Sequence, residues 1–311
     1  MLLCDPLWST YASMRRSWIR CRIASRVNKT SLLRRFRSRL YQLAASTREI
    51  LNLTPDRSLR RKFLETYFLT FFLGRLDTEK RLARIAGYPV RYCTEKSLKF
   101  LFDEIFVRQD YLFSAETARP FILDCGSNIG MSVLYFKLLY PQSEITAFEP
   151  DREAFACLEW NVRENGFAGV TVHRLALSNR EGELDFYYDP ADPGSLRMSA
   201  VWERMPGQKQ VVPCTRLSKF IDRDVDLLKL DVEGVEKEIL EDLQQAGKLG
   251  LVRQMVLEYH HHIHQDRDVF SGILGILEGA GFGYQLESAF SRPLRPHEFQ
   301  DILVYAYQKK S

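Results

Sequence analysis

A glycine-rich stretch at residues 124–130, Asp-Cys-Gly-Ser-Asn-Ile-Gly, is the part of the chain best suited to bind a small ligand. It follows the apolar run 121–123 and precedes 131–136, whose apolar residues have helical spacing. Gly126 and Gly130 leave room for a ligand against the backbone, and the start of a helix offers free N–H groups. A strand, this turn and a helix predict a nucleoside-binding half of a doubly wound sheet.

Glu149, which closes the next apolar run, narrows the choice of ligand. It lies 19 residues beyond Gly130, far enough along the unit for its two oxygens to bind a ribose diol. The glycine spacing is Gly-x-x-x-Gly, whereas a pyrophosphate is typically bound by Gly-x-Gly-x-x-Gly, so a dinucleotide is disfavoured. Asp124 would repel phosphates but would suit an amino group. These residues favour a ligand with a ribose, a cation and no phosphate, namely S-adenosylmethionine.

A second group of acids follows the apolar strand predicted at residues 225–231. Asp231 and Glu233 come at its carboxyl end, and Gly234 allows the chain to turn into the next helix. Ligands of doubly wound sheets bind outside the carboxyl ends of the strands, where the strand order reverses. If this strand lies beside the one that ends at Asp124, the acids share one cleft, where they would attract a sulfonium or polarise a hydroxyl. Either acid could instead cap the following helix.

Histidines follow the next predicted strand, residues 251–259. His260 is a candidate general base, because methyl transfer to an alcohol requires removal of the hydroxyl proton. In an extended chain His260, His262 and His264 would share one face and could bind a metal ion. No second group of ligands has matching spacing, so we predict a solvated loop and no metal site.

The charge is distributed unevenly along the 311 residues. Residues 1–62 contain fifteen Lys or Arg and three acids, a net charge of +12, whereas the whole chain carries +4, so that the remainder carries −8. Basic residues and aromatic residues alternate in this segment, which favours contact with an anionic membrane surface over nucleic acid. A basic face around an apolar packing stripe and an organellar transit peptide are alternatives.

Composition limits the location of the protein. The apolar content of 45% and the charged content of 27% are typical of a globular protein. No run approaches the roughly 18–20 apolar residues that span a bilayer. The six cysteines contain no CxxC pair, which favours free thiols in a reducing compartment. We therefore expect a cytoplasmic protein that is at most peripheral to a membrane.

Strands and helices alternate regularly from Pro120 onward, which predicts an α/β fold with right-handed crossovers. The pattern indicates a Rossmann-like, doubly wound, mainly parallel seven-stranded sheet with an N-terminal helical extension. We expect an extension or cap over residues 1–84 and a main domain over 85–311. Predicted strands lie at 121–125, 144–149, 170–175, 225–231, 251–259, 282–287 and 301–307, and the last two are expected to form an antiparallel hairpin. Predicted helices lie at 58–82, 97–108, 130–140, 151–165, 234–246 and 269–280.

With both motifs considered together, the chain resembles the FkbM family of S-adenosylmethionine-dependent methyltransferases. The resemblance rests on the residues 121–130, on Phe-Glu-Pro at 148–150 and on Leu-Lys-Leu-Asp-Val-Glu-Gly-Val-Glu at 228–236, and it covers roughly residues 88–290. It implies a sheet of the class I methyltransferase type and O-methylation of a hydroxyl on a sugar, glycan, polyketide or related small molecule.

The resemblance also implies roles for individual residues. The methionine end of the cofactor would be held by the loop residues Asp124, Gly126, Ser127, Asn128 and Gly130, and the ribose by Glu149. The segment that begins at Leu175 and contains Ala176 would border the adenine. Asp231, Glu233 and His260 are the candidate catalytic residues. The acceptor would be selected by the loop 189–207 and by the cap.

Two functions of other kinds remain as alternatives at this stage. The first is a membrane-surface or scaffold protein that keeps a cofactor-binding fold without turnover, and the second is a dinucleotide oxidoreductase. The sequence does not indicate the oligomeric state.

Overall fold

The computed structural model describes residues 32–54, 56–189, 199–202, 207–263, 268–288 and 299–309. Several predictions therefore concern parts of the chain outside the described residues. These parts are the basic segment 1–31, most of the loop 189–207, and His264.

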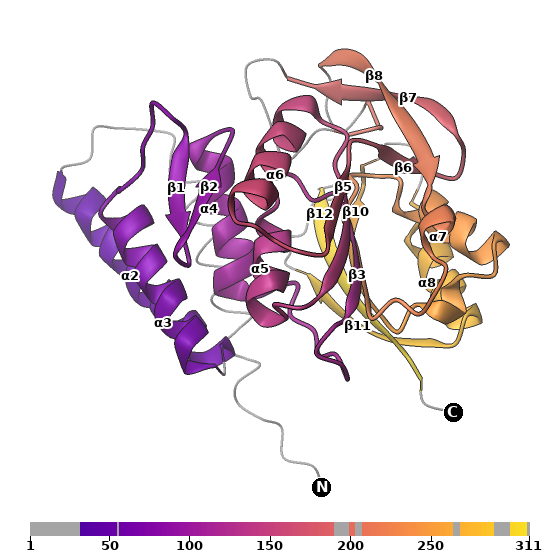
Figure 1. Cartoon of the computed structure of the whole chain (residues 1–311), viewed down its shortest axis with the longest axis horizontal. Helices are drawn as coiled ribbons and strands as arrows, with labels where there is room; N and C mark the ends of the chain where they lie inside the picture. The colour runs from indigo at the N-terminus through magenta and orange to yellow at the C-terminus, as the bar shows by residue number, and fades with distance from the viewer. Residues whose placement is uncertain are drawn as a thin grey trace, which may run out of the picture.

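A seven-stranded sheet forms the centre of the molecule, in the order β11-β12-β10-β9-β3-β4-β5 (Figure 1). Its five strands from β10 to β5 are parallel, and β12 runs antiparallel to both of its neighbours. The predicted sheet and its closing hairpin are confirmed. The strands are β3 (Phe121–Cys125), β4 (Glu144–Phe148), β5 (Val170–His173), β9 (Leu227–Leu230), β10 (Gln254–His261), β11 (Phe282–Ser288) and β12 (Gln300–Gln308).

Helices cover both faces of this sheet. In Figure 1, α5 (Met131–Leu139) and α6 (Arg152–Glu164) lie on the side of the N-terminal elements, and α7 (Glu236–Gln245) and α8 (Phe270–Gly279) lie on the opposite side. Asp151 caps α6, because its side chain accepts from the backbone N–H groups of Glu153 and Ala154. The four helices agree with the predictions to within two residues at each end.

A small three-stranded sheet interrupts the alternation, and the sequence pattern at residues 183–188 and 210–213 predicts its last two strands. It contains β6 (Ala176–Ser178), β7 (Gly182–Tyr188) and β8 (Gln208–Arg216) in the order β6-β8-β7. The chain then passes through two short 3₁₀ segments, η3 (Leu217–Phe220) and η4 (Leu249–Leu251), which flank β9 and α7.

The N-terminal elements differ in part from the prediction. The helix predicted over 58–82 is wrong at its end, because α3 (Arg57–Thr66) continues as a single π-helical segment η1 (Tyr67–Phe72) and then stops before Gly74. The chain instead forms a hairpin of β1 (Leu82–Ile85) and β2 (Tyr88–Arg91). The Thr70 hydroxyl, which donates to the carbonyl of Arg84, ties η1 to this hairpin.

Three further elements complete the N-terminal part, and the expected boundary between residues 84 and 85 falls inside β1. The described part of the chain begins with the long helix α2 (Leu32–Leu53). After the hairpin come α4 (Glu95–Phe102) and the π-helical η2 (Asp103–Arg108), which together occupy the helix predicted at 97–108.

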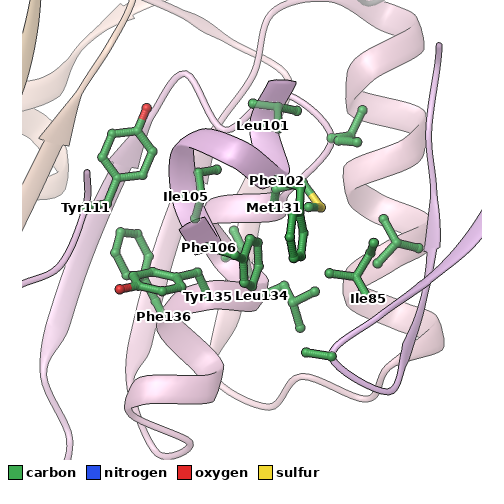
Figure 2. Packing of buried hydrophobic residues seen from close by; sticks show 14 of the residues in the cluster. Ile85, Leu101, Phe102, Ile105, Phe106, Tyr111, Met131, Leu134, Tyr135 and Phe136 are labelled. Atoms are coloured by element: carbon green, nitrogen blue, oxygen red, sulfur yellow. The ribbon is translucent and has the colours of Figure 1, made fainter. Parts of the chain in front are cut away.

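A continuous apolar core joins the N-terminal elements to the face of the main sheet covered by α5 (Figure 2). The rings of Phe102 and Phe106 are stacked with centroids 5.1 Å apart, and Phe106 meets Tyr135 of α5 edge to face at 5.4 Å. Because the cap shares this core, η2 and the residues after it are fixed in position next to the sheet. Within the described residues, no helix is long and apolar enough to cross a membrane.

Candidate active site

The carboxyl ends of β3 and β9 meet at the centre of the sheet and form the candidate site. The strands are parallel neighbours in which Asp124 lies opposite Lys229, so the predicted adjacency of the two strands is confirmed. The backbones approach so closely after the strands that a Cβ on Gly126 would lie 1.8 Å from the carbonyl oxygen of Asp231. Only glycine fits there, because any side chain would clash with this carbonyl and because the φ of +83° favours glycine.

The glycine-rich loop is held by the end of β4. The backbone N–H groups of Gly126 and Ser127 both donate to the carbonyl of Phe148. The N–H of Asn128 donates to Oε2 of Glu149 at 2.8 Å, and the N–H of Asp151 donates to Oε1 of the same carboxylate at 2.8 Å. The sequence predicted the two motifs separately, and the structure shows that Glu149 links them.

Glu149 is buried in this position, with 6% of the residue exposed. Burial raises the pKa of its carboxyl group to about 8, although the N–H groups of Asp151 and Asn128 act in the opposite direction. Each oxygen accepts one backbone hydrogen bond and keeps capacity for a further donor, such as a ligand hydroxyl.

The raised pKa of Glu149 predicts a dependence of stability on pH. The unfolded carboxyl ionises near 4.5 and the folded one near 8, so the folded state holds the proton more tightly. Its contribution to the free energy of unfolding therefore falls as the pH rises between these values, by at most about 5 kcal/mol. Glu149→Gln should remove this decline. Its melting temperature, measured without ligands, should rise relative to that of the wild type from pH 5 to pH 8; a constant difference would contradict the assignment.

Asp124 and Lys229 form a buried charged pair beneath the loop. Asp124 accepts at Oδ2 from the Ser132 hydroxyl at 2.6 Å, whereas its Oδ1 is buried without a hydrogen-bond partner among the described residues. The Lys229 ammonium lies 3.7 Å from that Oδ1 and 3.3 Å from Oδ2 of Asp231. It also donates to the carbonyl of Gly126 at 2.6 Å. Burial alone would lower the pKa of Lys229, but Asp231 and Asp124 raise it above its usual value, so the ammonium stays charged.

The three candidate catalytic residues lie together at the same cleft. Nε2 of His260 lies 3.3 Å from Oε2 of Glu233 and 3.9 Å from Oδ1 of Asp231. Glu233 reaches this place from a backbone with φ of +58°, a conformation that is rare for a residue with a side chain. The side chain of Asp231 is 22% exposed, so a small molecule can reach it.

Carboxylates surround His260 from several elements. Burial lowers the pKa of the ring, but Glu233 and Glu236 raise it, and the net pKa lies well above its usual value. Glu258, two residues earlier on β10, also has a strongly raised pKa because of burial and of the charges of Asp231 and Glu104. Glu258 and His260 therefore each hold a proton more tightly than the free side chains do.

The segment between β2 and β3 contributes residues that the sequence analysis missed. The Tyr111 hydroxyl donates to Oδ2 of Asp231 at 3.3 Å, and the Lys229 ammonium lies 5.1 Å from the centre of the Tyr111 ring. Glu104 of η2 is buried, which raises its pKa to about 8, and it pairs with Arg108 at 3.4 Å. The sequence held one indirect signal. Lys229 lies between two leucines in a buried strand, and a buried lysine needs polar or acidic partners from neighbouring elements.

Other predicted site residues lie at the edges of this cleft or away from it. Gly130 precedes α5 with φ of +84°, and a Cβ there would lie 2.7 Å from Leu158. Glycine is therefore required at this position by the fold, whether or not a ligand is bound. Ala176 packs its side chain into the small sheet. His262 has φ of +61° and its Nε2 lies 3.7 Å from Oδ2 of Asp268, so the chain is not extended there and the condition for a face shared with His260 is not met.

The loop predicted to select the acceptor contacts the turn that carries Glu233. The Ser199 hydroxyl donates to the carbonyl of Glu233. A Cβ on Gly234 would lie 2.8 Å from Val201, so this part of the loop covers the turn closely. The loop is therefore in place to affect what enters the cleft.

Comparison with known proteins places this cleft inside a matched region. Residues 124–285 match the family profile described as the Methyltransferase FkbM domain. "Methyltransferase 1" of Beauveria bassiana is 30% identical over 211 residues, which cover 61% of this chain and 83% of that protein. The "31-O-demethyl-FK506 methyltransferase FkbM" of Streptomyces tacrolimicus is 27% identical, and the match covers 66% of this chain and 90% of that protein.

A solved structure is also similar. The crystal structure of methyltransferase FkbM from Methylobacillus flagellatus aligns with a TM-score of 0.44 and 16% identity. The alignment covers 86% of this chain and 59% of that chain.

Proposed function

The chain belongs to the FkbM methyltransferase family and is a methyltransferase that uses S-adenosyl-L-methionine, and from this premise we propose that its acceptor is a hydroxyl group. The acceptor class would be a sugar, glycan, polyketide or related small molecule. Membership of this family argues against the two alternatives of another kind, a scaffold protein without turnover and a dinucleotide oxidoreductase.

The residues of the cleft fit this cofactor. In the part of the chain that the structure describes, Oδ1 of Asp124 is buried without a hydrogen-bond partner, so it is available to a donor such as an amino group. Glu149 keeps acceptor capacity on both oxygens, which suits the two hydroxyls of a ribose. At Gly126 and Asn128 few side-chain atoms cover the loop, so a ligand can approach its backbone. We assign these residues to cofactor binding, with Ser127 and Gly130 shaping the loop and the segment at Ala176 bordering the adenine.

The acidic cluster lies beside this pocket and supplies groups for the acceptor. When bound, the cofactor would supply a methyl group from a positively charged sulfur. The sulfur would keep the electron pair of the broken S–C bond and become a neutral thioether. Asp231 and Glu233 accept hydrogen bonds from the acceptor hydroxyl, and the cluster that they form with His260 takes up its proton. Orientation of the hydroxyl by these groups contributes most of the rate.

One observation carries the proposal. One ligand atom each of Asp231, Glu233 and His260 lies within 4.8 Å of the other two. The two acids follow β9, which is paired with β3, the strand that leads into the cofactor loop. A proton acceptor in that position is required for transfer to a hydroxyl and unnecessary for transfer to a thioether or an already ionised group. The name of the Streptomyces relative, which describes an O-demethyl substrate, supports the same chemistry.

A labelled-donor assay against a panel of sugars, lipids and polyketides tests the proposal. We expect label in at least one hydroxylated acceptor and none in the same compound with that hydroxyl already methylated. Replacing Asp231 with Asn should lower the turnover about 100-fold or more, because it removes a charged acceptor next to the hydroxyl. Transfer of label only to nitrogen or carbon acceptors would refute hydroxyl methylation.

We also propose contact of the basic N-terminal segment with an anionic membrane surface. Among the described residues, α3 contributes Arg57, Arg60 and Arg61 around a surface depression of about 510 Å³. The clustering of positive charge supports binding to anionic lipid headgroups.

A further inference from the structure

The His260 ring is held at one nitrogen by a buried carboxylate. Its Nδ1 lies 3.0 Å from Oε1 of Glu236, and both residues are 2% exposed. The same oxygen accepts the N–H of Gly234 at 2.9 Å, which fixes the carboxylate in place. An acceptor at Nδ1 holds a ring proton on that nitrogen, so Nε2 faces the cleft and would become a ligand when an arriving cation displaces its proton. Metal-binding histidines are oriented by carboxylates in this way.

The other ring nitrogen of His260, Nε2, faces two carboxylate oxygens. Nε2 of His260 lies 3.3 Å from Glu233 and 3.9 Å from Asp231, and the three ligand atoms lie within 4.8 Å of one another. Two carboxylate oxygens that converge on one point repel one another unless a positive charge lies between them. A proton on Nε2 could satisfy one of the two carboxylates, whereas a cation at the point of convergence satisfies all three groups.

The distances agree with the coordination of a small divalent ion. Ligands about 2.1 Å from an octahedral ion lie about 3.0 Å apart in cis positions and about 4.2 Å apart in trans positions. The observed 3.3 Å and 3.9 Å fall within that interval. Two carboxylates and one imidazole form a ligand set of the kind that Mn²⁺ accepts.

Glu258 is a second, independent observation at this place. It precedes His260 by two positions on β10, so both side chains lie on the same face of the sheet. Its carboxylate lies within 4.8 Å of the His260 ring nitrogen and of Asp301. Within the described part of the chain, the side chain of Glu258 has no hydrogen bond or ion pair with another residue, so its carboxyl oxygens are available to a ligand in the cleft.

We propose that Asp231, Glu233 and His260 bind one divalent cation, with Glu258 beside it. The site itself rests on the geometry alone. The role of the cation rests on the proposed function: it would bind the acceptor hydroxyl, lower the pKa of that hydroxyl and orient its oxygen. Of the histidines on this segment only His260 belongs to the proposed site, and the other ligands, Asp231 and Glu233, come from the turn after β9.

Titration of the full chain with Mn²⁺ tests the site directly. After treatment with a chelator, the wild type should bind one Mn²⁺, seen as a loss of the free-ion signal in electron paramagnetic resonance. Glu233→Gln should weaken this binding at least tenfold, because one charged ligand becomes neutral. Asp268→Asn is the matched control, since it removes the exposed acid of the other His–Asp group, His261, His262 and Asp268, and should leave Mn²⁺ binding unchanged.

The result is read separately from that of the proposed function. Calorimetric titration with S-adenosylmethionine on the same samples shows whether each variant is folded and binds the donor. Donor binding without saturable Mn²⁺ binding would overturn the metal site and leave the methyltransferase assignment intact. Equal Mn²⁺ binding by Glu233→Gln and the wild type, or its loss in Asp268→Asn, would also overturn the site. Saturable Mn²⁺ binding that Glu233→Gln weakens would support it even if no hydroxyl acceptor were found.

Discussion

Lys229→Met is expected to lower the free energy of unfolding by about 3–5 kcal/mol and to abolish detectable donor binding. The side chain is 2% exposed, and its ammonium lies between Asp124 and Asp231. Methionine fills a similar volume but carries no charge, so both carboxylates lose their only close ammonium among the described residues. Removing one partner of a buried charged group leaves the other charge uncompensated, which costs more than the pair contributes. Chemical denaturation measures the loss.

Lys137→Met is the matched control for this variant. Lys137 is also buried, but its ammonium donates to the carbonyl oxygens of Ser143 and Ala168 and, among the described residues, to no carboxylate. We expect it to cost less, because it leaves no buried charge behind, and donor binding should persist. Adding Asp124→Asn to Lys229→Met should recover part of the lost stability, which a double-mutant cycle would show as coupling of about 1–3 kcal/mol. Strict additivity would contradict the account of the buried pair.

Gly126→Ala is the second change with a large expected effect. The new methyl group would lie 1.8 Å from the carbonyl oxygen of Asp231, and the contact is with backbone, which cannot rotate away. The β3–α5 loop must then move away from the end of β9, and the cofactor loop and the acidic cluster separate. We expect donor affinity to fall at least 100-fold, as measured by calorimetric titration.

The control for Gly126→Ala separates the clash from backbone strain. Gly166 also has a left-handed backbone, with φ of +60°, but a Cβ there meets no atom within 4 Å. Gly166→Ala should cost only about 1 kcal/mol of stability and leave donor affinity unchanged. If both alanine variants had the same effect on donor binding, steric exclusion at Gly126 would not be the reason for its glycine.

The central strands could be predicted closely from the sequence for physical reasons. Each is a short apolar run that ends at a glycine or an acid, and β3 and β4 agree with the predicted ranges to within one residue. The rule that ligands bind where the strand order reverses made β3 and β9 candidate neighbours, and they are paired in the structure. Both predictions used local signals that the tertiary structure does not override.

The N-terminal elements were harder to predict because periodicity does not show where an apolar helix stops. Tyr67 and Phe71 continue the helical spacing beyond α3, but the chain widens into η1 and turns at Gly74. The strand β1 has four residues, too few to show alternation.

The acids of the site could be found from the sequence, but their partners could not. Asp124, Glu149 and Asp231 end predicted strands, which marks them as candidates. Tyr111 reaches Asp231 from 120 positions away, and such contacts depend on how the cap packs. Lys229 was part of a recognised motif, yet its role as the ammonium between two acids appeared only when β3 and β9 were placed side by side.

Calorimetric titration of the wild type with S-adenosylmethionine and with NAD, repeated on Glu149→Ala, tests the central claim most directly. We expect saturable binding of one S-adenosylmethionine, no binding of NAD, and at least tenfold weaker donor binding when the Glu149 carboxylate is absent. Binding of NAD with no response to S-adenosylmethionine, or undiminished donor binding by folded Glu149→Ala, would contradict the assignment of this cleft to the methyl donor.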